Sequence, residues 1–261
     1  MSDWYLGTVG FSYKEWAGVF YPAGSPARSY LALYSQIFNS VELDSTFYGT
    51  PPPDRVKQWA QAVPPDFRFC VKTPRQITHD LRLLNAEEGM AQFLGNISLF
   101  GDKLGAVLIQ LPPSLSTADL DLFNRFIAQL PPNFRYAVEF RHASWFNDLT
   151  ANLLAAHNIG WVSTEYVDAP KQVVPTTDFL YIRWLGRHGA FESKDRVQVD
   201  VLPQLAWWKS QIEPHLDRCK AVYGYFNNDY SGYSPQTCNR FKELLGLPVN
   251  QPELPEQKRL F

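Results

Sequence analysis

The sequence predicts an α/β fold, namely a single (β/α)8 TIM-like barrel with long strand-to-helix loops and a short C-terminal tail. Short β-branched or aromatic runs alternate with helical patterns, which is the order of parallel strands linked by crossover helices. Eight such runs occur, and eight parallel strands favour closure into a barrel. The loops that lead into strands are short, whereas several loops that follow strands are long and rich in Gly, Pro and aromatic residues. Barrels build their functional sites in such loops.

The expected strands are short and evenly distributed along the chain. They lie at residues 4–9, 40–43, 67–72, 106–111, 135–140, 159–164, 179–184 and 221–226, with amphipathic helical stretches at residues 119–130 and 202–216 among the segments between them. A doubly wound open sheet is the alternative fold, but it usually carries a GxGxxG fingerprint after its first strand. Residues 7–12 read GTVGFS and do not match that fingerprint.

Length and charge limit the function classes. The 261 residues are consistent with one domain at residues 1–247, followed by a Pro-flanked tail at residues 248–261. With 24 Lys and Arg against 26 Asp and Glu, the formal net charge is −2. No global field would therefore draw the protein onto nucleic acid or an anionic membrane. Any site for an anion must be local.

Cofactor and targeting signals are sparse. The three cysteines are far apart in sequence and lack CxxC or Cys/His spacing, so neither a disulfide framework nor a structural zinc is expected. No organic cofactor motif occurs. No HxH or HExxH pattern is present, and a metal ion is a possible but disfavoured cofactor. The N-terminus has no signal-peptide pattern and no apolar run could span a membrane, so we expect a cytoplasmic protein without a membrane partner.

Strand parity places polar side chains at the carboxyl ends of several strands. In residues 40–44 the apolar set is Val41 and Leu43, so Glu42 and Asp44 share the other face. In residues 135–141 the same alternation separates Glu139 and Arg141 from the apolar face. The positions expected on the inner side of the other strands are Lys72, Gln110 and Arg183, together with either Asn227 or Asn228 at the end of the last strand.

This convergence of charge predicts a functional site. Charged groups in a barrel mouth cost several kcal/mol unless they are paired. Two carboxylates beside cations could supply a general acid and a general base, and the cations could hold a phosphate, a carboxylate or a developing oxyanion. We therefore take Glu42, Lys72, Glu139 and Arg141 as candidate catalytic residues. The alternative is a set of mutually neutralising ion pairs without catalysis.

Six sequence blocks resemble the domain-of-unknown-function 72 family, the YecE-like barrels. The blocks are GTVGFSYKEWAGVFYP, FNSVELDSTFYGTP, FRFCVKTPRQITH, GDKLGAVLIQLPPS, YAVEFRHASWF and YGYFNNDYSGYSP, in that order between residues 5 and 246. The resemblance implies a barrel fold and brings no established activity. Besides the four candidate catalytic residues, it implies recurrent polar positions at Tyr13, Trp16, His79, Gln110, His142, Asn227, Asn228 and Asp229. With Arg183, these are our candidate substrate-binding residues.

The last five residues resemble the bacterial sliding-clamp-binding peptide, written Q-x-x-L-F. Gln257 could form a hydrogen bond at a pocket rim while Leu260 and Phe261 fill an apolar cleft. The alternative is that the terminal Leu and Phe pack back on the barrel. The tail is therefore a candidate partner-binding segment, and the bacterial sliding clamp is its candidate partner.

Three functions remain open at this stage. The first is an enzyme that acts on an anionic substrate, with a hydrolase as the candidate class. Its reaction would be phosphodiester or glycosidic hydrolysis of nucleic acid, linked to DNA replication or repair. The second is a hydrolase, lyase or isomerase of a small sugar or phosphorylated metabolite. The third is a non-catalytic adaptor that binds a ligand or nucleic acid. Barrel architecture alone does not decide among them.

We expect the tail motif to bind the clamp with micromolar affinity, about −8 kcal/mol. Replacing both Leu260 and Phe261 with Ala should abolish binding, because two apolar anchors supply most of the energy of such a peptide. Removing residues 248–261 should leave the melting temperature almost unchanged. Isothermal titration of the purified clamp would test this. Absence of wild-type binding at about 100 μM would reject the motif.

Overall fold

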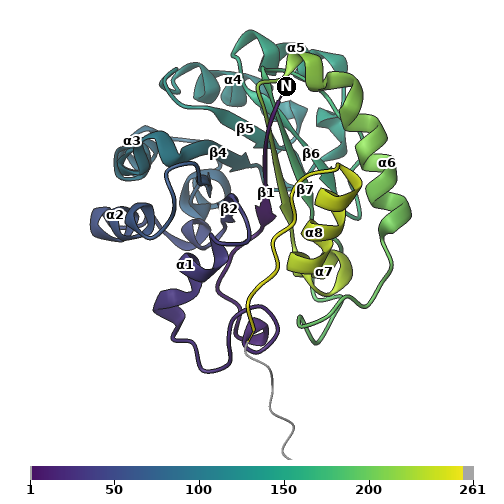
Figure 1. Cartoon of the computed structure of the whole chain (residues 1–261). Helices are drawn as coiled ribbons and strands as arrows, with labels where there is room; N and C mark the ends of the chain where they lie inside the picture. Colours follow the sequence, from purple (N-terminus) through teal and green to yellow (C-terminus); the bar gives the residue numbers. More distant parts are fainter. Residues whose placement is uncertain (1, 255–261) are drawn as a thin grey trace, which may run out of the picture.

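The computed structural model describes residues 2–254 of the chain, and its parallel strands form a nearly closed barrel (Figure 1). The strands are β1 (Asp3–Thr8), β2 (Ser40–Leu43), β3 (Arg68–Lys72), β4 (Leu104–Gln110), β5 (Tyr136–Glu139), β6 (Gly160–Glu165), β7 (Phe179–Trp184) and β8 (Ala221–Phe226). Their spatial order is β1-β8-β7-β6-β5-β4-β3-β2. The predicted (β/α)8 barrel is therefore confirmed, with strand ends within two residues of those expected.

Helices surround the barrel in Figure 1. They are α1 (Tyr30–Tyr34), α2 (Pro53–Gln61), α3 (Glu87–Ile97), α4 (Leu120–Ala128), α5 (Asp148–Ala156), α6 (Leu202–Ile212), α7 (Asn228–Ser231) and α8 (Ser234–Leu244). No helix links β6 to β7, which are joined instead by the loop at residues 166–178. Among residues 2–254, no helix is both long enough and apolar enough to cross a membrane.

Two layers of buried side chains follow from strand alternation. One layer, including Val41, Ile109 and Trp184, packs between the strands and the helices. The other fills the barrel interior and includes Cys70, Ala106, Leu108, Ala137, Val162, Tyr181, Tyr223 and Tyr225. Tyr225 forms a 2.6 Å hydrogen bond with the Ser40 hydroxyl. These interior side chains close the barrel beneath its carboxyl end.

Side chains hold much of the seam between β1 and β2. Among residues 2–254, the one backbone bridge at this seam joins Val9, directly after β1, to Glu42. The Tyr34 hydroxyl accepts from the Thr8 N–H at 2.8 Å and donates to the Ser40 carbonyl at 3.0 Å. A Cβ on Gly7 would lie 1.9 Å from that same carbonyl, so the close approach of the two strands requires glycine. Tyr34 thus substitutes for missing ladder bonds.

The described part of the tail contacts the barrel. Asn239 donates to the Asn250 carbonyl at 3.2 Å, and Asn250 donates to the Gln36 carbonyl at 3.1 Å. This segment, yellow in Figure 1, runs between α1 and α8. The clamp-motif residues Gln257, Leu260 and Phe261 lie outside the described residues.

Replacing Tyr34 with Phe should lower the free energy of unfolding by about 1–3 kcal/mol, because it leaves a buried N–H and a buried carbonyl without a partner. The matched control is Tyr30→Phe. Tyr30 is also buried, but its hydroxyl makes no hydrogen bond within residues 2–254, so its loss should change stability by less than about 0.5 kcal/mol. Urea unfolding measures both. Equal effects would show that Tyr34 does not hold the seam.

Candidate active site

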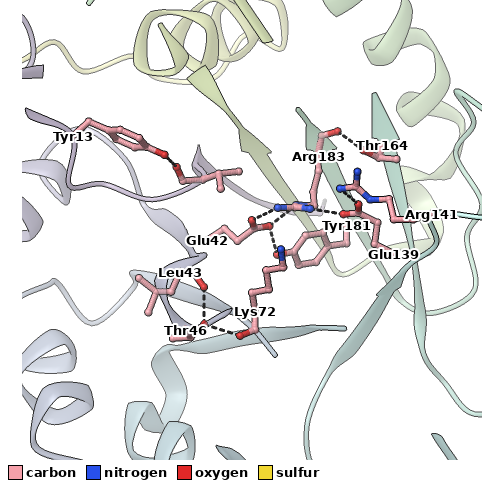
Figure 2. A network of polar contacts seen from close by, with 11 residues as sticks. Tyr13, Glu42, Leu43, Thr46, Lys72, Glu139, Arg141, Thr164, Tyr181 and Arg183 are labelled. Atoms are coloured by element: carbon pink, nitrogen blue, oxygen red, sulfur yellow. Dashed lines mark hydrogen bonds and ion pairs between the residues drawn. The ribbon is translucent and has the colours of Figure 1, made fainter. Parts of the chain in front are cut away.

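A charged network lies inside the carboxyl end of the barrel, where four strands contribute one side chain each (Figure 2). Glu42 lies on β2, Lys72 ends β3, Glu139 ends β5 and Arg183 lies on β7. Each has the same parity as an interior residue two positions earlier, such as Cys70 on β3 or Tyr181 on β7. The structure therefore brings together residues that sequence parity had placed on the inner side.

Arg183 lies between the two glutamates. Its Nε donates to Glu42 Oε2 at 2.9 Å and its Nη2 donates to Glu42 Oε1 at 2.7 Å. Its Nη1 donates to Glu139 Oε2. One guanidinium therefore binds both carboxylates, and the contact with Glu42 is bidentate (Figure 2).

Two further side chains complete the network. The Tyr181 hydroxyl donates to Glu42 Oε2 at 2.8 Å. Arg141 forms an ion pair with Glu139 through Nη2, and its guanidinium carbon lies 3.9 Å from the centre of the Tyr166 ring. Arg141 Nε is buried and has no hydrogen-bond acceptor among residues 2–254. This leaves one cationic donor of the network unmatched.

Burial makes these interactions strong. Glu42 and Glu139 have no exposed surface and Arg183 is 3% exposed, so little solvent screens their charges. Burial alone would raise the pKa of Glu139, but Arg141 and Arg183 outweigh it and lower that pKa to about 2. Burial would lower the pKa of Arg183, and the two glutamates reverse this and raise it. At neutral pH, Glu139 is a fixed negative charge and a poor proton donor.

Lys72 differs from the other members of the site. Its Nζ lies 4.0 Å from the centre of the Phe47 ring, and within the described chain it forms no ion pair or hydrogen bond through Nζ. Burial, followed by the positive charge of Arg183, lowers the pKa of Lys72 to about 8. Lys72 is half-buried at the mouth. Four charges of the network pair with one another, and Lys72 is left as the additional cation.

Asp44 adds a titratable carboxyl beside this cation. It follows β2 directly, and burial, together with the charge of Glu42, raises its pKa. The positive charge of Lys72 lowers the pKa of Asp44, so the Lys72 amine and the Asp44 carboxyl interact. Asp44 also lines a cavity of about 650 Å³ beside Tyr13, Tyr48 and Trp59. The five charged residues of the network do not line this cavity, so Asp44 is the titratable group that borders it next to Lys72.

His79 and Gln110 lie near the network without entering it through a hydrogen bond. The His79 ring packs edge-on against Phe47 with centroids 5.0 Å apart, and its Nδ1 lies 2.8 Å from the Thr78 hydroxyl. Burial and the charge of Lys72 lower the pKa of His79. Gln110 ends β4 in register with Glu139. Both residues thus flank the inner charges.

Tyr13, Trp16 and His142 have local structural contacts. The Tyr13 hydroxyl donates to the Val9 carbonyl at 2.7 Å (Figure 2). Trp16 is fully buried, with its ring centroid 4.7 Å from that of Tyr13. His142 accepts a hydrogen bond from the Ser144 N–H through Nδ1 at 3.2 Å, which caps the turn after β5. These contacts anchor loops around the mouth.

The three residues after β8 also have structural partners. Asn227 Oδ1 accepts from the Asp229 N–H at 2.9 Å. Asn228 is buried, and its Oδ1 accepts from the backbone and the hydroxyl of Ser234 at 3.0 and 2.8 Å. Asp229 lies 3.6 Å from Lys194 Nζ and so holds the long loop between β7 and α6. Within residues 2–254, no hydrogen bond or ion pair joins these three residues to Glu42 or Glu139.

Four contributing residues were missing from the candidates chosen from sequence. Tyr181 and Asp44 carry a usable signal, because each lies two positions from a chosen residue on the same face of its strand. Phe47 and Tyr166 lie in exit loops, where parity no longer applies. Among residues 2–254, no group of three or more His, Cys, Asp or Glu side chains is placed to hold a metal ion.

Lys72→Met should raise the free energy of unfolding by about 1–2 kcal/mol at neutral pH. The folded-state pKa is about 8 against an ordinary value of 10.5, so the unfolded chain holds more protons between these values and wild-type stability rises with pH there. Below about pH 8, Lys72 is charged in both the folded and the unfolded chain, so the full cost of burying its charge lowers the free energy of unfolding. The gain from Lys72→Met should therefore shrink as the pH approaches 10.5.

Urea unfolding of wild type and variant at about pH 7 and about pH 9.5 would measure this difference. Lys209→Met is the control, because Lys209 lies on α6 in an i,i+4 pair with Glu213 and its removal should have an effect below about 0.5 kcal/mol. Destabilisation by Lys72→Met at neutral pH would contradict the prediction.

Comparison with known proteins agrees with this architecture. The family model for "Protein of unknown function DUF72" matches residues 5–259. The chain is 31% identical to the UPF0759 protein YecE of Escherichia coli strain K12, over 98% of this chain and 99% of the relative. It is 26% identical to the UPF0759 protein YunF of Bacillus subtilis strain 168, over 93% and 95% of the two chains.

Solved structures with the same fold come from two bacteria. A DUF72 family protein of Thermotoga maritima superposes with a TM-score of 0.80 at 31% identity, covering 94% of this chain and 99% of that one. A DUF72 family protein of Enterococcus faecalis gives a TM-score of 0.77 at 22% identity, covering 95% and 99%, which shows likeness of fold alone. From the family match along nearly its whole length, this chain belongs to the DUF72 family.

Proposed function

We propose that this protein is an enzyme that binds a small anionic substrate at the carboxyl mouth of the barrel. One observation carries the proposal. Arg141 Nε is a buried cationic donor without an acceptor among residues 2–254. Lys72 Nζ forms no ion pair or hydrogen bond in the same residues, and both side chains are partly exposed. Donors left unmatched in a desolvated place are costly unless a ligand uses them. A carboxylate or phosphate oxygen is the matching group.

The other charges have a supporting role in this proposal. Glu42 and Glu139 hold Arg183, and Glu139 also holds Arg141, so the cationic donors are oriented before a substrate arrives. Asp44 has a pKa raised by burial, whereas that of Glu139 is lowered, so Asp44 is the better proton-exchanging group of the two. The expected pairing of Glu42 and Glu139 as acid and base is replaced here by Asp44 with Lys72.

The enclosed charges favour a small molecule over nucleic acid. The Arg141 side chain is 10% exposed and Arg183 is 4% exposed, so neither can contact a bulky phosphate backbone at the surface. The formal net charge of −2 supplies no general attraction for such a polymer. Hydrolysis of nucleic acid would become the better proposal if Gln257, Leu260 and Phe261 proved to bind the clamp.

Titration with inorganic phosphate and with lactate tests the anion site. Arg141→Gln should weaken binding of at least one of these probes by tenfold or more, since about 1.4 kcal/mol corresponds to that factor. The charge-matched control is Arg187→Gln, because Arg187 is exposed in the β7–α6 loop and its loss should leave affinity within about twofold.

Calorimetry gives the affinities, and circular dichroism checks that each variant is folded. Lys72→Met provides a second variant of the same site and should weaken the same probe. If neither probe binds wild type, or if Arg141→Gln and Lys72→Met both bind as wild type does, the proposed anion site is wrong.

A further inference from the structure

Among residues 2–254, Lys72 has a setting that differs from those of the other lysines. Lys171 pairs with Glu165 and Lys220 pairs with Asp178. Lys103 donates to two backbone carbonyls. Lys72 is instead the last residue of β3, and its side chain lies on the inner side of the barrel beside the Arg183 network. Its amine lies over the face of Phe47. Figure 2 shows its side chain directed toward Glu42 and Tyr181. Its amine is therefore confined among charged groups without being used by any of them as an ion-pair partner.

Such surroundings activate an amine as a nucleophile. Desolvation and a neighbouring cation both favour the neutral form of lysine, and these are the two ways in which proteins prepare lysine for attack on a carbonyl. Both apply here, since burial and Arg183 lower the pKa of Lys72 to about 8. A useful fraction of the amine is then neutral near physiological pH.

We propose that the Lys72 amine forms an imine with a 2-oxo acid, a molecule whose carbonyl lies next to a carboxylate. The inference rests on the proposed function, because the carboxylate would be held by Arg141 while the adjacent carbonyl reaches Lys72. Arg141 and Lys72 project from β5 and β3 ends on either side of β4.

The covalent step balances without a further reagent. The neutral Lys72 nitrogen attacks the carbonyl carbon, a C–N bond forms, and the C=O π electrons move to oxygen, which receives the proton lost by nitrogen. Protonation of that hydroxyl lets it leave as water while the nitrogen lone pair forms the C=N bond. One amine, one carbonyl and one proton from solvent thus give one protonated imine and one water. The cationic imine can then accept electrons from an adjacent C–C or C–H bond, as a lyase or isomerase requires.

Reductive trapping tests the inference directly. Wild-type protein is incubated with pyruvate and borohydride, which reduces an imine to a stable secondary amine, and the modified lysine is located by peptide mass spectrometry. Modification should occur at Lys72 and should be lost in Lys72→Arg. The rate should rise with pH toward a plateau with a midpoint near 8.

Lys242 is the matched control within the same molecule. It is also half-buried, its Nζ lies 5.8 Å from the centre of the Phe38 ring, and burial lowers its pKa. It has no arginine ion-pair network around it in the described structure. We expect at least tenfold more trapping at Lys72 than at Lys242. Equal trapping at the two lysines would show that a desolvated amine alone suffices and would overturn the inference.

Lactate separates this inference from the proposed function, because it has the carboxylate of pyruvate but no carbonyl. Binding of lactate or phosphate that depends on Arg141, with no trapping of pyruvate at Lys72, would reject the imine and leave the anion site intact. Absence of both would reject both proposals. Trapping at Lys72 that falls at least tenfold in Arg141→Gln would support both.

Discussion

The arrangement of Arg183 between Glu42 and Glu139 is the interaction on which the carboxyl end of this barrel depends. Three strands, β2, β5 and β7, are joined by one buried guanidinium. Removing any one partner would leave an uncompensated buried charge, at a cost of about 3–5 kcal/mol. The network therefore fixes the inner side chains as well as the strands, and it does so next to the weakly bridged seam between β1 and β2.

This network also determines which groups remain available for chemistry. Glu42 accepts three hydrogen bonds from Arg183 and Tyr181, and Glu139 binds two arginines. Carboxylates held in this way orient positive charge, and the two arginines lower the pKa of Glu139 to about 2, so that Glu139 exchanges protons poorly. The proposed chemistry consequently moves outward to Lys72 and Asp44, whose pKa values are shifted toward neutrality.

Strand parity explains how much could be predicted from sequence. The alternation in residues 40–44 and 135–141 placed Glu42 and Glu139 on the inner side, and the structure has both there. Parity says nothing about partner choice across the barrel, which depends on strand stagger and on side-chain length. The pairing of Arg183 with both glutamates, and the exclusion of Lys72 from it, could not be derived from a single sequence for this reason.

Positions after a strand were harder to interpret because the chain leaves the period-two pattern there. Asn228 caps α8 by accepting a hydrogen bond from the Ser234 N–H. His142 caps the turn after β5 by accepting one from the Ser144 N–H. The polar atoms of both residues therefore serve local structure. Capping residues and site residues have the same chemistry in a sequence. Only the path of the loop separates them, and that path is set by long-range packing such as the burial of Trp16.

An unpaired lysine at such a place is difficult to understand as a structural feature. A methionine or leucine at position 72 would fill the same space without the cost of desolvating a charge, and the four other charges already neutralise one another. Stability alone would therefore not select Lys72. Violations of local energetic rules that are supported by a fixed surrounding network are typical of functional sites. The physical case for chemistry at this mouth thus rests on Lys72, which the ion pairs of the network do not use, together with the unmatched Nε of Arg141.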